Sequence, residues 1–188
     1  MTESPDPAGR RPGEETVTLG LGSNLGDRLA SLRRGWAAVG ALDGVRPLDC
    51  SGIWETAYVG PGGAQPPYLN ACARIATVLA PRALLTALQR IERDCGRPPA
   101  THLRPRILDL DILLFGDRLV REPDLVIPHP RLRERAFVLE PLAELDPGLI
   151  LPDSGLTVGA VRAIIRAAGG PPVRPLPGGT LAWDGNDG

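Results

Sequence analysis

Residues 105–116 read Pro-Arg-Ile-Leu-Asp-Leu-Asp-Ile-Leu-Leu-Phe-Gly. The apolar run at 107–115 predicts a β-strand, in which side chains two residues apart face the same side. Asp109 and Asp111 therefore share one face, with their Cα atoms about 6.6 to 6.8 Å apart. The side chains expected on the opposite, core face are those of Leu108, Leu110, Ile112 and Leu114.

The two neighbouring carboxylates indicate a metal site, because like charges at this separation repel each other unless a metal cation or an arginine lies between them. Mg²⁺ held by two carboxylates keeps several waters and takes its other oxygens from substrate phosphates. The pair therefore favours a nucleotide substrate. A solvated strand face without a metal is the alternative.

The elements on either side of this strand predict a small α+β fold. Their order of strand, helix, strand, strand, helix, strand is typical of a split βαβ, ferredoxin-like sandwich. We expect a mainly antiparallel sheet with the helices packed on one face, which leaves the other face for a site. The expected strands are 16–21, 49–58, 68–79 and 107–115, the expected helices are 28–40 and 81–95, and a short return strand, an apolar run at 136–145 and a helix at 157–168 follow.

The length of 188 residues favours one domain with a sizeable core. Residues 1–15 and 171–188 are rich in Pro and Gly, so we expect a flexible leader and a mobile or superficially packed tail. A single catalytic domain is then expected at 16–170.

The composition excludes several classes of function. All 21 basic residues are arginine, which excludes a Walker-type phosphate loop, a Schiff base and pyridoxal chemistry. The net charge of −1 gives no overall basic field for nucleic acid. Three widely spaced cysteines and two distant histidines match neither a zinc site nor a disulfide framework, and no apolar run is long enough to cross or anchor to a membrane. We expect a cytoplasmic protein.

Basic residues flank the aspartate strand on both sides. Guanidinium groups match phosphate oxygens in shape and stay charged at any working pH. His129 lies between two prolines, which hold it rigidly, and a purely structural role is its alternative. The arginines are Arg97, Arg104 and Arg106 before the strand and Arg131, Arg133 and Arg135 after it, where a solvated face is the alternative.

A second group of candidates surrounds a Gly- and Pro-rich loop at 59–67. Tyr68 and Asn70 share one face of the strand after the loop, and Thr56 lies near the end of the strand before it. A ring face and an amide suit a flat heterocycle with amide-like edges. Phe137 is a further candidate for stacking, with core packing as its alternative.

Together these motifs resemble the 6-hydroxymethyl-7,8-dihydropterin pyrophosphokinases of folate biosynthesis, over about residues 16–153. The Pro-Arg-x-Leu-Asp-Leu-Asp segment is highly specific in combination with the others, whereas a lone Asp-x-Asp is not. The matching segments are 22–27, 68–71, 89–92, 96–97, 105–116, 127–130 and 135–142.

The resemblance implies transfer of the β,γ-pyrophosphoryl group of ATP to the 6-hydroxymethyl oxygen of the dihydropterin, with release of AMP. It implies that Asp109 and Asp111 hold two Mg²⁺ ions and act as catalytic residues together with Arg97 and Arg106. The ATP contacts it implies are Gln89, Glu92, Arg97, Arg106, Ile112, His129 and Arg135, where Gln89 and Glu92 project as a polar pair from the second helix.

For the pterin, the resemblance implies a ring stacked between Tyr68 and Phe137. The pterin contacts it implies are Thr56, Ala57, Val59, Tyr68, Asn70 and Phe137. The loop at 97–104 departs from the family's pattern, because it is one residue shorter and carries two prolines, with Leu103 where a tryptophan is usual. We expect slower or weaker closure of this loop over the site.

Two other classes of function fit part of the pattern. Another Mg-dependent nucleotidyl- or phosphotransferase on a ferredoxin-like fold would share the aspartate pair but would not need the stacking residues. An inactive nucleotide-binding module would not need paired carboxylates with arginines around them. We expect a monomer whose partners are small molecules, ATP and the dihydropterin.

Overall fold

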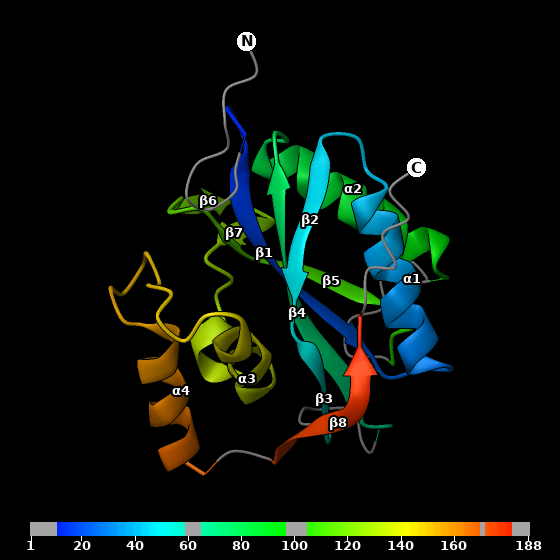
Figure 1. Ribbon diagram of the computed structural model, residues 1–188, viewed down its shortest axis with the longest axis vertical. Helices are drawn as coiled ribbons and strands as arrows, with labels where there is room; N and C mark the ends of the chain where they lie inside the picture. Colours follow the sequence, from blue (N-terminus) through cyan, green and yellow to red (C-terminus); the bar gives the residue numbers. More distant parts are fainter. Residues whose placement is uncertain (1–10, 59–64, 97–104, 170–171, 182–188) are drawn as a thin grey trace.

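The computed structural model describes residues 11–58, 65–96, 105–169 and 172–181, and Figure 1 shows a central sheet with helices on both sides. Among these residues no helix is long and apolar enough to cross a membrane. The strands are β1 (Glu15–Ser23), β2 (Val45–Cys50), β3 (Gly52–Thr56), β4 (Tyr68–Thr77), β5 (Asp109–Phe115), β6 (Val120–Glu122), β7 (Leu125–Ile127) and β8 (Val173–Thr180). The helices are α1 (Arg28–Gly40), α2 (Pro81–Asp94), the 3₁₀ turn η1 (Leu132–Glu134), α3 (Ala136–Leu145) and α4 (Val158–Ala167).

The main sheet runs in the order β5-β1-β4-β3-β8, with β2 also paired to β4. All of its neighbours are antiparallel. The first two-thirds of the chain, from β1 to β5, follow the split βαβ path, which confirms the expected ferredoxin-like α+β class. The expected return strand forms a separate hairpin of β6 and β7.

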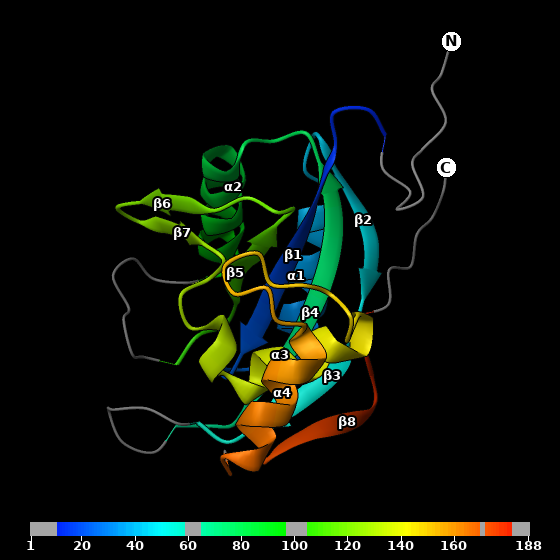
Figure 2. The ribbon, with the colours of Figure 1, turned by 90° about the vertical axis from the view of Figure 1, so that its left-hand side faces the viewer.

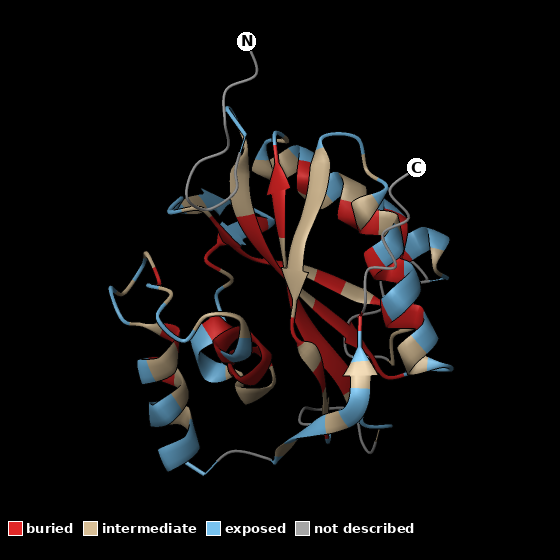
Figure 3. Cartoon of the chain, viewed as in Figure 1, coloured by how far each residue is buried: buried red, intermediate tan, exposed pale blue. Residues whose placement is uncertain are grey.

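Two helices cover one face of the sheet, as the sequence predicts. Asp27 caps α1 by accepting a hydrogen bond from the backbone N–H of Ala30 at 3.0 Å, and Pro81 begins α2. The inward side chains of α1, α2, β1, β4 and β5 form the larger hydrophobic core. Figure 3 shows this buried layer on the inner faces of both helices.

The expectation that helices cover one face only is wrong. Helix α3 packs on β3 and β4 from the other side, and α4 packs on α3 (Figure 2). The reason is a second apolar cluster, in which Cys72 and Leu113 point away from the first core and are covered by Leu139 and Leu142 of α3. The open part of this face lies beside α3.

A bulge changes the expected alternation on β5. The register with β1 shifts between Thr18 and Leu19, so that Thr18 pairs with Leu114 and Leu19 with Ile112. Leu114 therefore belongs to the second cluster, and Phe115 takes the place expected for it in the first core. The face shared by the two aspartates is unaffected, because the bulge lies after them.

The strand expected at 49–58 is two strands, β2 and β3, separated at Ser51. The Ser51 hydroxyl accepts a hydrogen bond from the Cys72 N–H at 3.0 Å, which replaces regular pairing at the break. Both segments pair with β4, so the break bends the strand without removing it from the sheet.

The expected tail is also corrected. Residues 173–180 form β8, an edge strand paired with β3, and Leu181 is buried in the first core. The sequence did not predict this strand because it contains Pro175 and Pro177, which lack a backbone N–H donor. An edge strand tolerates proline because its outer side forms no hydrogen bonds to a neighbouring strand. The folded domain thus extends beyond the boundary expected at 170.

Candidate functional site

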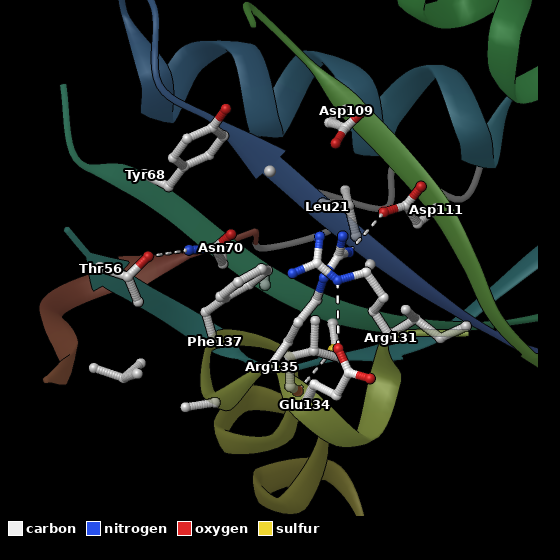
Figure 4. Close-up of a pocket in the computed structure, with 18 of the residues that line it drawn as sticks. Leu21, Thr56, Tyr68, Asn70, Asp109, Asp111, Arg131, Glu134, Arg135 and Phe137 are labelled. Carbon is white, nitrogen blue, oxygen red and sulfur yellow. Dashed lines mark hydrogen bonds and ion pairs between the residues drawn. The ribbon is translucent and has the colours of Figure 1, made fainter. Parts of the chain in front are cut away.

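A cavity of about 330 Å³ lies on the second face of the sheet, beside the start of α3. Its lining joins the two groups of residues that the sequence singled out. Asp109 and Asp111 lie at one side of it, and Thr56 and Asn70 lie at the other (Figure 4). Residues more than 30 positions apart in the chain therefore form one site.

Two glycines of β1 line the cavity. Gly20 and Gly22 of β1 face it, between the aspartates of β5 and the polar residues of β4. A Cβ atom on Gly22 would lie 3.5 Å from Asn70 Oδ1 and 3.8 Å from Asp109 Cβ. Sequence reasoning did not assign these glycines a role, although glycine at alternate positions of a strand is a signal for close approach of a ligand.

The two carboxylates project into the cavity from β5, as expected. Asp109 accepts a short hydrogen bond from the Arg106 guanidinium. Oδ2 of Asp111 lies 3.7 Å from Arg135 Nη1 and 3.9 Å from His129 Nε2. Both carboxylates remain partly exposed.

His129 presents one defined nitrogen to the site. Its Nδ1 accepts a hydrogen bond from the Arg131 N–H at 3.1 Å, so the proton of the neutral ring is on Nε2, which faces Asp111. Burial, aided by the charge of Arg135, lowers the pKa of His129 from 6.5 to about 4. At neutral pH the ring is an uncharged donor.

Of the three arginines after β5 that the sequence singled out, two line the cavity and one lies outside it. Arg131 and Arg135 line the cavity, whereas Arg133 forms an ion pair with Asp153 at 3.3 Å. The segment between Arg131 and Arg135 is the 3₁₀ turn η1, so these arginines do not follow the period of a strand. Burial lowers the pKa of Arg135, but the guanidinium stays charged at neutral pH.

Asn24 positions the loop that carries Arg106. Its Oδ1 accepts from the Arg106 N–H at 2.7 Å, and its own N–H donates to the Arg106 carbonyl at 3.0 Å. Its side-chain amide also donates to Gln65 Oε1 and to the carbonyl of Pro66. Sequence reasoning gave Asn24 no role of its own; its place in a strand–turn–helix junction is the signal that could have found it.

Two aromatic rings lie on opposite sides of the cavity (Figure 4). Tyr68 comes from β4 and stacks on Tyr58, with ring centroids 6.3 Å apart. Phe137 comes from the first turn of α3, with the Arg135 guanidinium 5.5 Å from its ring centroid. The space between Tyr68 and Phe137 suits a flat ring.

Asn70 and Thr56 form the polar end of this space. The Asn70 amide donates to the Thr56 hydroxyl at 3.0 Å, and both side chains are buried. This bond leaves the Asn70 carbonyl oxygen and its second N–H for a ligand. The neighbouring Ala57 also lines the cavity.

Three residues expected to contact ATP do not line this cavity. Gln89 is exposed on α2, and Ile112 is buried in the first core. Glu92 turns inward and accepts a hydrogen bond from the Leu110 N–H at 2.8 Å, so the polar pair expected with Gln89 does not form. Val59 and Arg97 lie outside the described residues.

The described residues contain no group of three or more His, Cys, Asp or Glu side chains that could hold a metal. Two carboxylates facing a cavity rimmed by arginines do fit Mg²⁺ whose remaining oxygens come from water and phosphate. They do not fit a site that is closed by protein ligands alone.

The chain matches one family over most of its length. The family described as 7,8-dihydro-6-hydroxymethylpterin-pyrophosphokinase matches residues 18–147. A 2-amino-4-hydroxy-6-hydroxymethyldihydropteridine pyrophosphokinase of Pseudomonas aeruginosa is 42% identical over 74% of this chain and 85% of that protein. Proteins of the same name from Synechocystis and Haemophilus influenzae are 39% and 37% identical, over 76% and 78% of this chain and 72% and 91% of theirs.

Solved structures share the fold. A crystal structure of HPPK-DHPS in complex with substrates matches 82% of this chain and 44% of its own, with a TM-score of 0.64 and 12% identity. A structure of Plasmodium falciparum HPPK-DHPS with SDX-DHP matches 80% of this chain and 41% of its own, with a TM-score of 0.66 and 16% identity. The chain thus spans less than half of these longer proteins.

Proposed function

The chain belongs to the 7,8-dihydro-6-hydroxymethylpterin-pyrophosphokinase family, and we propose that it transfers pyrophosphate from ATP to the hydroxymethyl group of this dihydropterin, for folate synthesis. One observation carries the proposal. The aspartate pair and the heterocycle pocket open into the same cavity, on either side of Gly22.

The carboxylates of Asp109 and Asp111 would hold Mg²⁺, two ions by the family resemblance. When bound, the metal supplies neutralising charge for the triphosphate. Arg106 donates a hydrogen bond to Asp109, so its guanidinium lies next to the position that the phosphates would take. The same guanidinium would donate to a phosphate oxygen of ATP.

Three side chains would hold the triphosphate. Arg106 and Arg135 supply fixed positive charge, and His129 supplies a neutral N–H on Nε2. Transfer of this kind needs little covalent chemistry from the protein, because positioning and charge stabilisation give most of the rate. This explains how a chain without lysine can be a kinase. Arg97, Gln89, Glu92 and Ile112 remain expected on the ATP side from the resemblance alone.

The pterin would lie between Tyr68 and Phe137. Asn70, held by Thr56, would bind the amide-like edge of the ring with both a donor and an acceptor. The hydroxymethyl group would then point across Gly22 toward the aspartates. Its oxygen attacks the β-phosphorus of ATP, the bond to the α-phosphate oxygen breaks, and AMP leaves.

The proposal is tested by AMP release from ATP and Mg²⁺, with and without 6-hydroxymethyl-7,8-dihydropterin. We expect release that depends on the pterin. ATP turnover that ignores the pterin would favour the alternative, another Mg-dependent nucleotide enzyme. We also propose that the chain acts as a monomer, which sedimentation of the active protein tests.

A further inference from the structure

One carboxylate outside the cavity joins helix α3 to strand β3. Oε1 of Glu144, near the end of α3, accepts a hydrogen bond from the Gly52 N–H at 3.0 Å. Oε2 of the same carboxylate accepts one from Trp54 Nε1 at 2.9 Å. None of these three residues lines the cavity. We call this pair of hydrogen bonds the Glu144 contact.

The same two elements carry residues of the cavity at their other ends. On α3, Phe137 lies seven residues before Glu144, about two turns away along the helix and on the same side of it. On β3, Trp54 and Thr56 are two residues apart and share one face. Trp54 also pairs in register with Asn70, whose amide donates to Thr56. The Glu144 contact and the space beside Phe137 therefore lie between the same faces of α3 and of the sheet.

The apolar contacts of α3 do not fix its position along β3 by themselves. Its side chains Leu139 and Leu142 cover Cys72 in the second cluster, and contacts of this kind depend little on direction. A hydrogen bond, in contrast, weakens steeply as its angle departs from a straight line. Two donors that bind the two oxygens of one carboxylate therefore select one position of the helix along the strand.

The Glu144 contact depends on a close approach of the two elements. A Cβ atom on Gly52 would lie 3.3 Å from Glu144 Oε1, closer than an ordinary contact. The Glu144 side chain is exposed, so its charge remains solvated and costs little desolvation. A charged acceptor also strengthens the hydrogen bond from the indole N–H of Trp54. The contact thus adds directional bonds to the apolar packing of α3 without burying an ion.

We propose that Glu144 is a positioning residue for pterin binding, which fixes α3 along β3 and so holds the Phe137 ring opposite Asn70. This inference rests on the proposed function. Since Phe137 would touch a face of the pterin and Asn70 its edge, a shift of α3 along β3 would separate these two contacts. The carboxylates of β5 would keep their positions, because α3 does not carry them. Loss of the Glu144 contact should therefore weaken binding of the pterin and not of ATP.

The experiment measures steady-state kinetics for Glu144→Gln, Trp54→Phe, the double variant and the control Glu15→Gln. A glutamine has one oxygen and one NH2 group, so in Glu144→Gln a donor faces one of the two donors of β3. The KM for the pterin should rise about 2- to 10-fold, and the KM for ATP should not change. Glu15 pairs with Arg118 away from the cavity, so Glu15→Gln should change neither value.

The double variant separates positioning from a general loss of packing. Trp54→Phe removes the indole N–H, so the glutamine can offer its oxygen to Gly52 and its NH2 group to water. Glu144→Gln should therefore raise the KM for the pterin less in the Trp54→Phe background than in the wild type. Effects that simply multiply overturn the proposal, as does an unchanged KM for the pterin in Glu144→Gln or a rise that ATP shares equally.

Equilibrium binding of the pterin, with Mg²⁺ and a nonhydrolysable ATP analogue, gives the same comparison without turnover. Thermal melting shows that each variant is folded, and the exposure of Glu144 predicts little change in melting temperature. Equal dissociation constants for the pterin in wild type and Glu144→Gln overturn the proposal. If wild type binds no pterin, the proposed function itself fails, which differs from a failure of the Glu144 contact alone.

Discussion

Asp109 and Asn70 pair with the same residue, Gly22, from the two strands on either side of β1. Neighbouring strands lie 4.7 to 4.9 Å apart, so these two positions are separated by about 9.5 Å. Since Gly22 has no side chain, it places no atom between the side chains of Asp109 and Asn70. One substrate can therefore contact the Asp109 carboxylate with one end and the amide of Asn70 with the other.

A side chain at Gly22 should block the site without unfolding the sheet. A Cβ atom there meets its neighbours at ordinary contact distances, so Gly22→Ala should fold normally. Gly22→Val adds two methyl groups in the space of the ligand and should raise the KM for the pterin about tenfold or more. Steady-state kinetics and melting temperatures check this. An unchanged KM in a folded Gly22→Val protein would contradict the assigned place of Gly22 in the cavity.

The aspartates should be needed for turnover and not for folding. Asp109→Ala or Asp111→Ala should lower kcat at saturating ATP by at least about 100-fold, because a direct ligand of the metal is lost. Both carboxylates are partly exposed, so the melting temperature should change little. The exposed Asp117 provides the control, and Asp117→Ala should keep wild-type activity over a Mg²⁺ titration. Full activity in either site variant would remove the metal assignment.

The pKa of His129 should lie far below that of an ordinary histidine. Its pKa of about 4 in the folded chain, against 6.5, means that the folded state binds this proton less readily than the unfolded state. Its contribution to stability is therefore complete above pH 6.5 and is lost as the pH falls toward 4. NMR titration of the ring in metal-free protein measures this midpoint, with His102→Gln to assign the signal. A midpoint at or above 6.5 would contradict a pKa lowered by burial.

Arg28 should support pterin binding from outside the cavity. Its Nη1 donates to Glu55 Oε1 at 2.8 Å and to the Pro67 carbonyl at 2.9 Å, which ties the end of β3 to the start of β4. Loss of these bonds loosens Thr56 and Tyr68, which follow Glu55 and Pro67 directly. Arg28→Ala should raise the KM for the pterin about 2- to 10-fold and leave that for ATP unchanged.

The control for the Arg28 substitution is Arg118, which forms an ion pair with Glu15 on the surface away from the cavity. Arg118→Ala removes a similar ion pair and should leave both KM values unchanged. Equal effects of the two substitutions, or an effect of Arg28→Ala on ATP alone, would assign Arg28 a general structural role.

The local pattern was sufficient to predict most of the first core and several of the cavity residues. Period-two spacing placed Asp109 with Asp111 and Tyr68 with Asn70, because alternation in a strand depends only on the backbone. It failed at Leu114, where a bulge shifts the register, since the bulge depends on the partner strand. The distance between the aspartate pair and the pair of Tyr68 and Asn70 depends on the order of the strands in the sheet. That order cannot be inferred from the spacing of residues along the chain.

Other features depend on contacts between distant segments. Glu92 looks like a surface residue of an amphipathic helix, yet the Leu110 N–H gives its buried carboxylate a partner. The strand β8 has a tail-like composition, and only the free edge of β3 makes it a strand. Neither the partner of Glu92 nor the partner of β8 can be inferred from the local sequence. The wrong predictions for Glu92 and for the tail therefore have the same physical origin.

The identity of the pterin product tests the central claim most directly. ATP, Mg²⁺ and 6-hydroxymethyl-7,8-dihydropterin are incubated with the protein, and the products are separated and identified by mass and phosphorus NMR. The account predicts equal amounts of AMP and a pterin that carries a diphosphate on its hydroxymethyl oxygen. ADP with a pterin monophosphate, or AMP with unmodified pterin, would contradict it.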